Sequence, residues 1–219
     1  TAETAAAAAA HDGAVVGLGI DSCNRLMVSG GVDRVVRVWE FKTGRVVSEL
    51  SVGSSLTHLH LHTGSALCAT AADDLVLRVY DIEAARLVRR FRGHTDRVTS
   101  LQLSSDARWL LSASMDGTVK VWDVPSAQCL QTLVLGGPPV TCLSLSPSLD
   151  LLATAHADRR GIYLWANQAV FGAGGADVLV PRTKPVRVGM PRLAADAEPD
   201  DSTGGGEGAP VLHSMVLEA

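Results

Sequence analysis

The sequence predicts an all-β protein built from repeated four-stranded units. The stretch from Phe91 to Asp123 alternates apolar and polar residues in two runs, which is the period-of-two pattern of strands. A turn containing glycine, Asp116-Gly117, separates two of its predicted strands. A closing aromatic residue then recurs at positions 39, 80, 122 and 165, which are 41, 42 and 43 residues apart. Because a few short strands cannot bury both of their faces alone, each unit must pack against further copies.

This period divides the chain into four repeats between two flanking segments. We expect the repeats at residues 11–50, 51–92, 93–135 and 136–171. Residues 1–10 are rich in alanine and are expected to form a flexible linker, whereas residues 172–219 are of low complexity, which predicts a disordered tail. In the fourth repeat, one additional residue separates Asp158 from the closing Trp165. This insertion predicts a bulge or a longer turn around residues 159–161.

Composition and charge narrow the classes of protein to consider. The 219 residues are 47% hydrophobic and carry a formal net charge of −4, which is not the strong positive field that sequence-independent phosphate binding needs. No apolar run approaches the ~20 residues of a membrane-spanning helix, and the start at Thr1 lacks the pattern of a signal peptide. The four cysteines are scattered and form no CxxC pair, which is typical of small apolar residues in a reducing compartment.

A histidine, a hydroxyl residue, an aspartate and an aromatic residue recur at matching positions of the repeats. The complete set in the third repeat is His94, Ser112, Asp116 and Trp122. The sets of the other repeats are partial: His11, Ser29, Asp33 and Trp39 in the first; Thr70, Asp74 and Tyr80 in the second; and Thr154, Asp158 and Trp165 in the fourth. A tryptophan N–H buried between strands needs an acceptor, so we interpret these residues as structural.

Catalytic motifs are absent from the sequence. It contains no G-x-S-x-G elbow around a serine, no P-loop, no GxGxxG at a strand–helix junction and no HExxH. We therefore expect no catalytic residue, no cofactor site and no enzyme activity.

The repeat period, the Gly93-His94 start and the Trp122-Asp123 end resemble the WD40 repeat family of β-propellers, which have four strands in each blade. The resemblance implies that each polar set forms a chain of hydrogen bonds from indole to hydroxyl, from hydroxyl to imidazole and from imidazole to carboxylate. It also implies that about four blades of a larger propeller, usually of seven blades, are present. We therefore expect the chain to be part of a longer protein, because an open propeller leaves two blade faces exposed.

Two groups of residues are candidates for binding partners. The first group precedes the turn aspartates, on the face that WD40 proteins often use for partners, and comprises Val32, Asp73, Met115 and Ala157. The second group lies in the last predicted strand of the second repeat and comprises Arg86, Arg89, Arg90 and Arg92. We interpret these arginines first as charge that protects an edge strand from aggregation, and alternatively as a patch for RNA phosphate or an acidic partner.

Alternating histidines in the second repeat raise the question of a metal site. His58, His60 and His62 lie on one face of a predicted strand, and two histidines at i and i+2 can chelate zinc. No cysteine or carboxylate with ligand-like spacing joins them. We therefore expect no metal.

The last two repeats resemble one WD40 family more closely. Residues 151–171 (LLATAHADRRGIYLWANQAVF) and 108–130 (RWLLSASMDGTVKVWDVPSAQCL) are similar to the last and penultimate WD repeats of the family of U3 small nucleolar RNA-associated protein 21, also called WD repeat-containing protein 36. The resemblance covers about residues 11–171. It implies a non-catalytic scaffold of the small-subunit processome, within the UtpB subcomplex, acting in pre-rRNA processing and 18S rRNA maturation. The implied partners are other processome proteins, with U3 snoRNA and pre-rRNA reached through the assembly, and the implied location is the nucleolus.

The alternative interpretation is a generic WD40 interaction adaptor, such as a substrate receptor of a cullin ubiquitin ligase. Those receptors often carry arginine three residues after the closing tryptophan. The corresponding residues here are Lys42, Glu83, Pro125 and Gln168, so that motif is missing. Under either interpretation we expect neither membrane insertion nor a small-molecule substrate.

Overall fold

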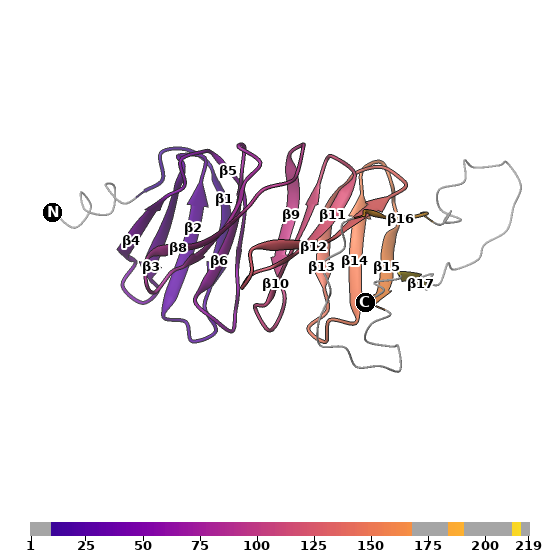
Figure 1. Ribbon diagram of the computed structural model, residues 1–219. Helices are drawn as coiled ribbons and strands as arrows, with labels where there is room; N and C mark the ends of the chain where they lie inside the picture. Colours follow the sequence, from indigo (N-terminus) through magenta and orange to yellow (C-terminus); the bar gives the residue numbers. More distant parts are fainter. Residues whose placement is uncertain (1–9, 168–183, 191–211, 216–219) are drawn as a thin grey trace, which may run out of the picture.

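The computed structural model describes residues 10–167, 184–190 and 212–215, and every regular element within them is a strand. The prediction of an all-β protein is therefore confirmed. The strands form four sheets, here called blades one to four, which stand side by side in the order of the sequence (Figure 1). No helix in the described ranges is long and apolar enough to cross a membrane. Most of the predicted linker and tail (residues 1–9, 172–183, 191–211 and 216–219) lies outside the described residues.

Each blade is formed by consecutive strands. Blade one contains β1 (Val15–Ile20), β2 (Leu26–Gly31), β3 (Val35–Glu40) and β4 (Arg45–Ser51). Blade two contains β5 (Leu56–Leu61), β6 (Leu67–Ala72), β7 (Leu77–Asp81) and β8 (Arg86–Phe91). Blade three contains β9 (Val98–Leu103), β10 (Trp109–Ser114), β11 (Thr118–Asp123) and β12 (Gln128–Leu135). Blade four contains β13 (Val140–Leu145), β14 (Leu151–His156) and β15 (Ile162–Asn167).

These consecutive strands pair antiparallel with their neighbours in the chain, and the same irregularity recurs in three blades. The register between the third and fourth strands shifts immediately before the closing aromatic residue, at Trp39, Tyr80 and Trp122. A bulge bends a strand and increases its twist. Its repetition shows that the repeats agree in local geometry as well as in sequence.

The first strands of the blades pack directly on one another, β1 on β5, β5 on β9 and β9 on β13. Every second residue of these first strands faces the neighbouring blade, and in β1 those residues include two glycines. Leu59 and Leu61 of β5 meet the backbone of Gly17 and Gly19 in β1, where an added Cβ would lie 2.7 Å and 2.4 Å from the two leucine Cβ atoms. Glycine is therefore required in β1 by the close approach of the next blade.

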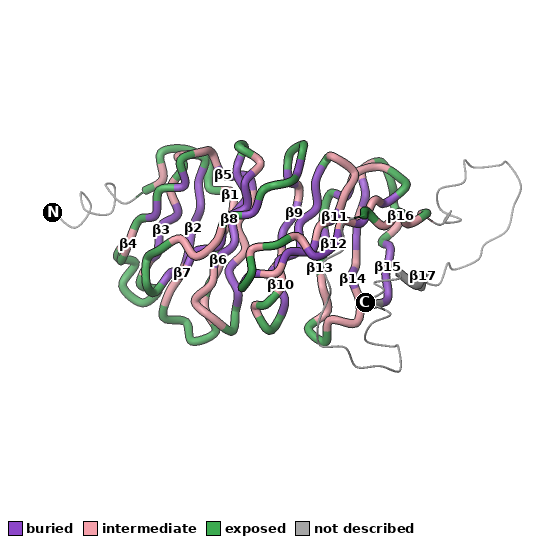
Figure 2. Tube along the Cα trace, viewed as in Figure 1, coloured by how far each residue is buried: buried purple, intermediate pink, exposed green. Residues whose placement is uncertain are grey.

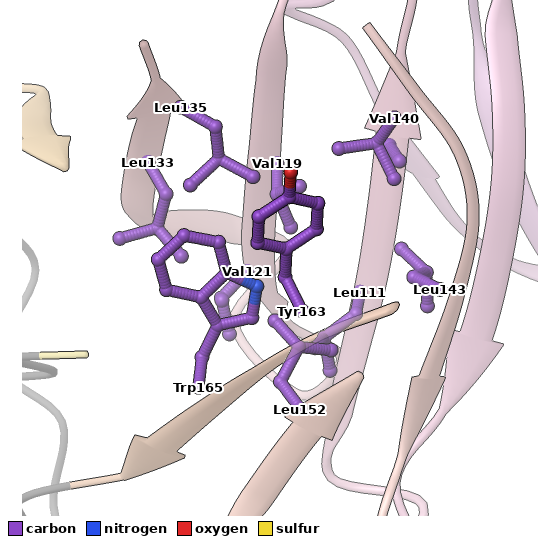
Figure 3. Packing of buried hydrophobic residues seen from close by; sticks show 11 residues of the cluster. Leu111, Val119, Val121, Leu133, Leu135, Val140, Leu143, Leu152, Tyr163 and Trp165 are labelled. Carbon is purple, nitrogen blue, oxygen red and sulfur yellow. The ribbon is translucent and has the colours of Figure 1, made fainter. Parts of the chain in front are cut away.

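The buried apolar residues form three clusters, and each cluster fills the space between two adjacent blades. One unites Val28, Val36 and Val38 of blade one with residues of blade two, and a second joins blades two and three around Phe91 and Trp122. The third joins blades three and four around Tyr163 and Trp165 (Figure 3). Figure 2 shows the resulting pattern, in which burial follows the inner strands and exposure follows the turns.

One face of blade one is uncovered among the described residues. Leu18 and Ile20 in β1 are 66% and 42% exposed. Leu101 and Leu103 hold the same register positions in β9, where blade two covers them to 6% and 2% exposure. The exposed face of blade one thus carries the side chains that a neighbouring blade buries elsewhere.

Two short strands come from the segment in which the sequence predicts no element. β16 (Val186–Val188) pairs parallel with β12, and β17 (Leu212–Met215) pairs parallel with β15. Low complexity does not prevent a short segment from pairing, because the outer strand of a sheet offers unpaired backbone N–H and C=O groups.

The insertion in the fourth repeat lengthens a turn and does not create a bulge. β14 and β15 pair without a register shift, from Leu151 and Ala166 to Ala155 and Ile162. Six residues separate that last pair, whereas five separate the corresponding pair in each of the other blades.

Candidate functional site

Blade three joins its four polar and aromatic residues into one buried hydrogen-bonded chain. The indole N–H of Trp122 donates to Ser112 Oγ over 2.8 Å, and His94 Nε2 lies 2.7 Å from the same hydroxyl. His94 Nδ1 lies 2.9 Å from Asp116 Oδ2. Because the ionised Asp116 carboxylate can only accept, we assign the imidazole proton to Nδ1. Nε2 then accepts from the Ser112 hydroxyl, whose oxygen accepts from the indole N–H.

The hydrogen-bonded network of blade three favours the ionised form of Asp116. Burial alone would raise the pKa of this carboxyl group. Hydrogen bonds from His94, from the Thr118 side chain and from the backbone N–H of Thr95 outweigh burial and hold the pKa well below its ordinary value. Asp116 therefore anchors both the loop before β9 and the turn before β11.

Blade one forms the same chain from His11, Ser29, Asp33 and Trp39. The Trp39 indole N–H donates to Ser29 Oγ over 2.7 Å, and the His11 ring nitrogens lie 2.7 Å from Ser29 Oγ and 2.9 Å from Asp33 Oδ2. Arg37 of β3 adds an ion pair, with Nη1 at 2.7 Å from Asp33 Oδ2. Burial opposes ionisation of Asp33, but the hydrogen bonds from Arg37 and His11 lower its pKa to about 2.

Blade two has lost this chain and replaced it with an ion pair. Arg78 of β7 donates to both carboxylate oxygens of Asp74, and this contact lowers the Asp74 pKa although burial opposes the effect. Thr70 Oγ1 is fully buried and has no hydrogen-bond partner in the described part of the chain. Tyr80 does not supply the indole N–H, and Val52 stands where a histidine would be. Thr70 and Asp74 are therefore not brought into one network.

Blade four builds a different hydrogen-bonded network through His156, which is not among the residues predicted from the sequence. The Trp165 indole N–H donates to Thr154 Oγ1 over 2.8 Å, and His156 Nε2 lies 3.0 Å from that hydroxyl. His156 Nδ1 then donates to the Pro138 carbonyl over 2.7 Å. His156 follows Thr154 by two residues on β14, so both side chains lie on one face of the strand. That spacing is the signal by which the sequence could have revealed it.

Asp158 is not joined to His156 by a hydrogen bond among the described residues. The backbone explains the difference. Asp158 itself has a φ of 57°, whereas in the other blades the residue after the aspartate takes the positive φ, at Arg34, Leu75 and Gly117. The longer turn thus moves the left-handed residue one position earlier, and a backbone carbonyl replaces the carboxylate as the acceptor.

The Asp–His–Ser order in blade three has the sequence of contacts found in a hydrolase triad. Ser112, however, has no exposed surface, and its hydroxyl lies between the Trp122 indole and the His94 imidazole. A nucleophile must reach a substrate and a neighbouring oxyanion site. The geometry therefore favours a structural role for the set.

Two of the three histidines of blade two, His60 and His62, connect it to blade three, whereas the buried Nδ1 of His58 has no hydrogen-bond partner among the described residues. His60 Nδ1 accepts a hydrogen bond from Leu103 N over 3.3 Å, and His62 Nε2 lies 3.1 Å from Ser105 O. Gln102 and Ser100 repeat this arrangement one blade further, since they accept from Leu145 N and Leu143 N. In the described residues, no group of three or more His, Cys, Asp or Glu side chains is arranged to hold a metal ion.

The four residues before the turn aspartates occupy equivalent places on one rim. In each blade their backbone N–H donates over 2.9 Å to a carbonyl that precedes the first strand, in the pairs Val32 with Ala14, Asp73 with Ser55, Met115 with Arg97, and Ala157 with Pro139. We call this the turn rim. Val32 and Met115 are 38% and 43% exposed, Asp73 is exposed, and Ala157 is partly buried. The structure thus brings all four to the same edge of successive blades.

Three of the four predicted arginines, Arg86, Arg89 and Arg90, lie on β8, the outer strand of its sheet, and Arg92 follows directly after the strand; the four are not equivalent. Arg86, Arg90 and Arg92 are exposed. Arg89 instead donates from Nε and Nη2 to the Pro125 carbonyl of blade three, over 3.1 Å and 2.9 Å. Arg89 therefore ties two blades together, and the exposed positive charge at this edge comes from Arg86, Arg90 and the adjacent Arg92.

Comparison with known proteins relates the sequence of this chain to a family. The chain matches the sequence model of the WDR36/Utp21 second beta-propeller domain over residues 2–191. It is 38% identical over 154 residues to U3 small nucleolar RNA-associated protein 21 homolog of Schizosaccharomyces pombe, which covers 69% of this chain and 17% of that protein. It is also 38% identical over 162 residues to WD repeat-containing protein 36 of Homo sapiens, with 74% and 18% covered.

A third relative agrees with these two. U3 small nucleolar RNA-associated protein 21 of Saccharomyces cerevisiae is 37% identical over 161 residues, which are 74% of this chain and 17% of that protein. The chain thus spans less than one fifth of the length of the curated relatives it matches.

Proposed function

Because this chain belongs to the WDR36/Utp21 family, in which it matches the second β-propeller domain, we propose that it acts as a non-catalytic scaffold in ribosome biogenesis. In finer terms, we propose that it serves the small-subunit processome within the UtpB subcomplex, in pre-rRNA processing and 18S rRNA maturation. Its partners would be other processome proteins, with U3 snoRNA and pre-rRNA reached through the assembly, and its location would be the nucleolus. The family match over residues 2–191 carries the proposal.

The distribution of polar groups supports a scaffold. The residues most similar to a catalytic set, Ser112 and His94, are buried and bonded to one another. The exposed features lie on rims and outer strands, where they can meet another macromolecule. Exposed apolar residues such as Met115 are adaptable contact residues in protein interfaces.

Affinity purification of the full-length protein tests the proposal. Recovery of U3 snoRNA together with processome proteins is expected, and imaging should place the tagged protein in the nucleolus. Recovery of cullin adaptors without that RNA would contradict the proposal and would favour the ubiquitin-ligase alternative.

A matched pair of variants then tests the turn rim. Met115 and Phe41 are similarly exposed, at 43% and 44%, but they lie near opposite ends of the third strands of their blades. Met115→Glu is expected to reduce recovery of a processome protein several-fold, whereas Phe41→Glu leaves recovery unchanged. If both variants recover the processome protein equally, the turn rim is not part of the interface.

The exposed arginines of β8 are tested by a separate readout. If they meet phosphate, the double variant Arg86→Glu/Arg90→Glu should reduce RNA crosslinking to this segment and leave protein recovery unchanged. Arg89 is not a suitable target, since its loss would also disturb the contact with Pro125. If the crosslinking of the double variant matches that of the unmodified protein, the arginines act only as protection of an edge strand.

A further inference from the structure

The outer edge of β12 differs from the outer edges of β4 and β8. β4 carries Arg45 and Glu49, and β8 carries three arginines. Charged side chains on an edge strand discourage pairing with another strand. β12 has the sequence QCLQTLVL and carries no charge. Of these three outer strands, β12 is the one on which the structure shows an added strand, the parallel β16.

In the segment that contains β16, alternate side chains pack against the blade at the β12 edge. Val186 pairs with Leu133 and Val188 with Leu135, so both valines extend the apolar face that these leucines present to blade four. Figure 3 shows that face, with Leu133 and Leu135 near Trp165. Val186, Val188 and Met190 are partly buried against this cluster, while Arg187 and Gly189 are exposed. The segment therefore has the pattern apolar-x-apolar-x-Met.

Gly136 and Gly137, which follow β12, contact the end of the segment that contains β16. The backbone N–H of Gly136 donates to the Val188 carbonyl over 2.9 Å, which continues the ladder beyond the strand. An added Cβ on Gly137 would lie 2.1 Å from the Met190 sulfur, so the thioether occupies the space that a side chain at 137 would fill. Gly136 and Gly137 thus provide a backbone donor and a socket for methionine.

From these observations we propose that the β12 edge with Gly136 and Gly137 is a recognition site for an extended peptide strand of the pattern apolar-x-apolar-x-Met. Main-chain hydrogen bonds provide affinity in such β-strand addition, and pockets for alternate side chains provide specificity. The chain's own segment Val186–Met190, here called the strap, occupies the site in cis. A partner with the same pattern would bind there when the strap is displaced.

A synthetic peptide of residues 184–190 (KPVRVGM), labelled at its N-terminus, tests the proposal by fluorescence anisotropy. A tethered segment competes at an effective concentration of up to about millimolar, so the unmodified protein should bind the free peptide weakly. The variant Val186→Asp/Val188→Asp, which disables the strap, should bind it at least about tenfold more tightly. The variant Arg187→Asp changes an exposed position of the same strap and should behave like the unmodified protein.

A blocked socket gives the specificity control. Gly137→Leu in the strap-disabled protein should abolish binding of the peptide, and a peptide with methionine replaced by aspartate should not bind to the unblocked site. If neither the unmodified nor the strap-disabled protein binds the peptide, the edge is not a recognition site. If both bind it equally, the strap does not occupy the site.

Hydrogen exchange on the unmodified protein measures occupancy of the site by the strap and requires no variant. The Gly136 amide should exchange slowly because it donates to Val188 O. Exchange at the rate of an open turn would overturn occupancy by the strap. A concentration-dependent dimer held together by exchanged straps would also overturn occupancy in cis.

Discussion

The indole N–H of Trp165 donates a hydrogen bond to Thr154 Oγ1 over 2.8 Å, in a place where blade two has Tyr80 and Thr70. Thr154 and Thr70 are both buried threonines on the second strand of a blade. The first holds an indole and an imidazole, whereas the second has no hydrogen-bond partner within the described ranges. We therefore expect these equivalent residues to make opposite contributions to the free energy of unfolding, which matched substitutions can measure.

Replacing each threonine by valine, which has nearly the same shape, separates the two cases. Thr154→Val leaves the Trp165 N–H and His156 Nε2 without partners and should lower the free energy of unfolding by about 1–3 kcal/mol. Thr70→Val removes an unsatisfied hydroxyl and should be neutral or stabilising by up to about 1 kcal/mol. Urea unfolding followed by tryptophan fluorescence measures both. A loss of more than about 1 kcal/mol in Thr70→Val would show that the hydroxyl has a partner.

Asp33 should make the stability of blade one sensitive to acid. Its pKa in the folded protein is about 2, below the ordinary value of 3.8, so its contribution is fully present above pH 3.8 and is lost as the pH falls through about 2. Asp33→Asn should therefore be less stable than the unmodified protein at pH 6. The difference between the two should shrink between about pH 4 and pH 2. A difference that stays constant over this window would contradict the assigned ion pair with Arg37.

His60 should produce a second pH dependence, in a higher range. Burial, followed by the nearby His62, lowers the pKa of His60 below its ordinary value of 6.5. Stability linked to neutral His60 is therefore fully present above about pH 6.5 and is lost as the pH falls through the lowered pKa. Protonation would place a second donor against the Leu103 N–H, at the contact between blades two and three.

The variant His60→Asn tests this contact. Asparagine offers an oxygen acceptor near the position of Nδ1 but does not titrate. Unfolding measured at several values between about pH 7 and pH 5 should depend less steeply on pH in this variant. Some dependence should remain, because burial also lowers the pKa of His58, with Arg97 nearby, and that of His156. An unchanged slope would exclude His60 as a contributor.

Arg34 is an exposed residue held in a left-handed conformation, with a φ of 68°. This conformation costs a residue with a Cβ about 1–2 kcal/mol, and glycine loses part of that advantage through its flexibility in the unfolded chain. Arg34→Gly should therefore raise the free energy of unfolding by about 0.5–1 kcal/mol.

The reverse change provides the control. Gly117 occupies the equivalent turn with a φ of 76°, and an added Cβ there would meet no atom within 4 Å. Gly117→Ala should destabilise by about 1 kcal/mol through conformation alone. Stabilisation by both variants would show that the turns are not equivalent.

Gly19 tests how closely blades one and two approach. A Cβ at this position would lie 2.4 Å from Leu61 Cβ, which cannot move without its strand. Gly19→Ala should therefore destabilise by about 1–3 kcal/mol, or more if the blades separate. Gly44→Ala meets no atom within 4 Å and should show only the cost of its positive φ. Thermal unfolding of the two variants separates overpacking from conformational strain.

The local order of residues was sufficient to predict much of this fold. Alternation of apolar and polar residues places the strands, and Asp116-Gly117 marks a turn because glycine takes positive φ cheaply. The recurring aromatic residue gives the repeat. Each of these signals acts within about 40 residues, which is the length of one blade.

What the sequence alone could not decide depends on contacts between segments far apart. In blade four, one left-handed residue in the longer turn decides that the Pro138 carbonyl, and not Asp158, accepts from His156. In blade two, Arg89 donates to a carbonyl of the next blade. The strap pairs with an edge about 50 residues earlier in the chain, where an uncharged strand and two glycines meet it. The sequence by itself determined the repeated blade, because strand and turn preferences are local. The tertiary structure decided how each blade satisfies its buried polar groups, because those partners come from other turns and other blades.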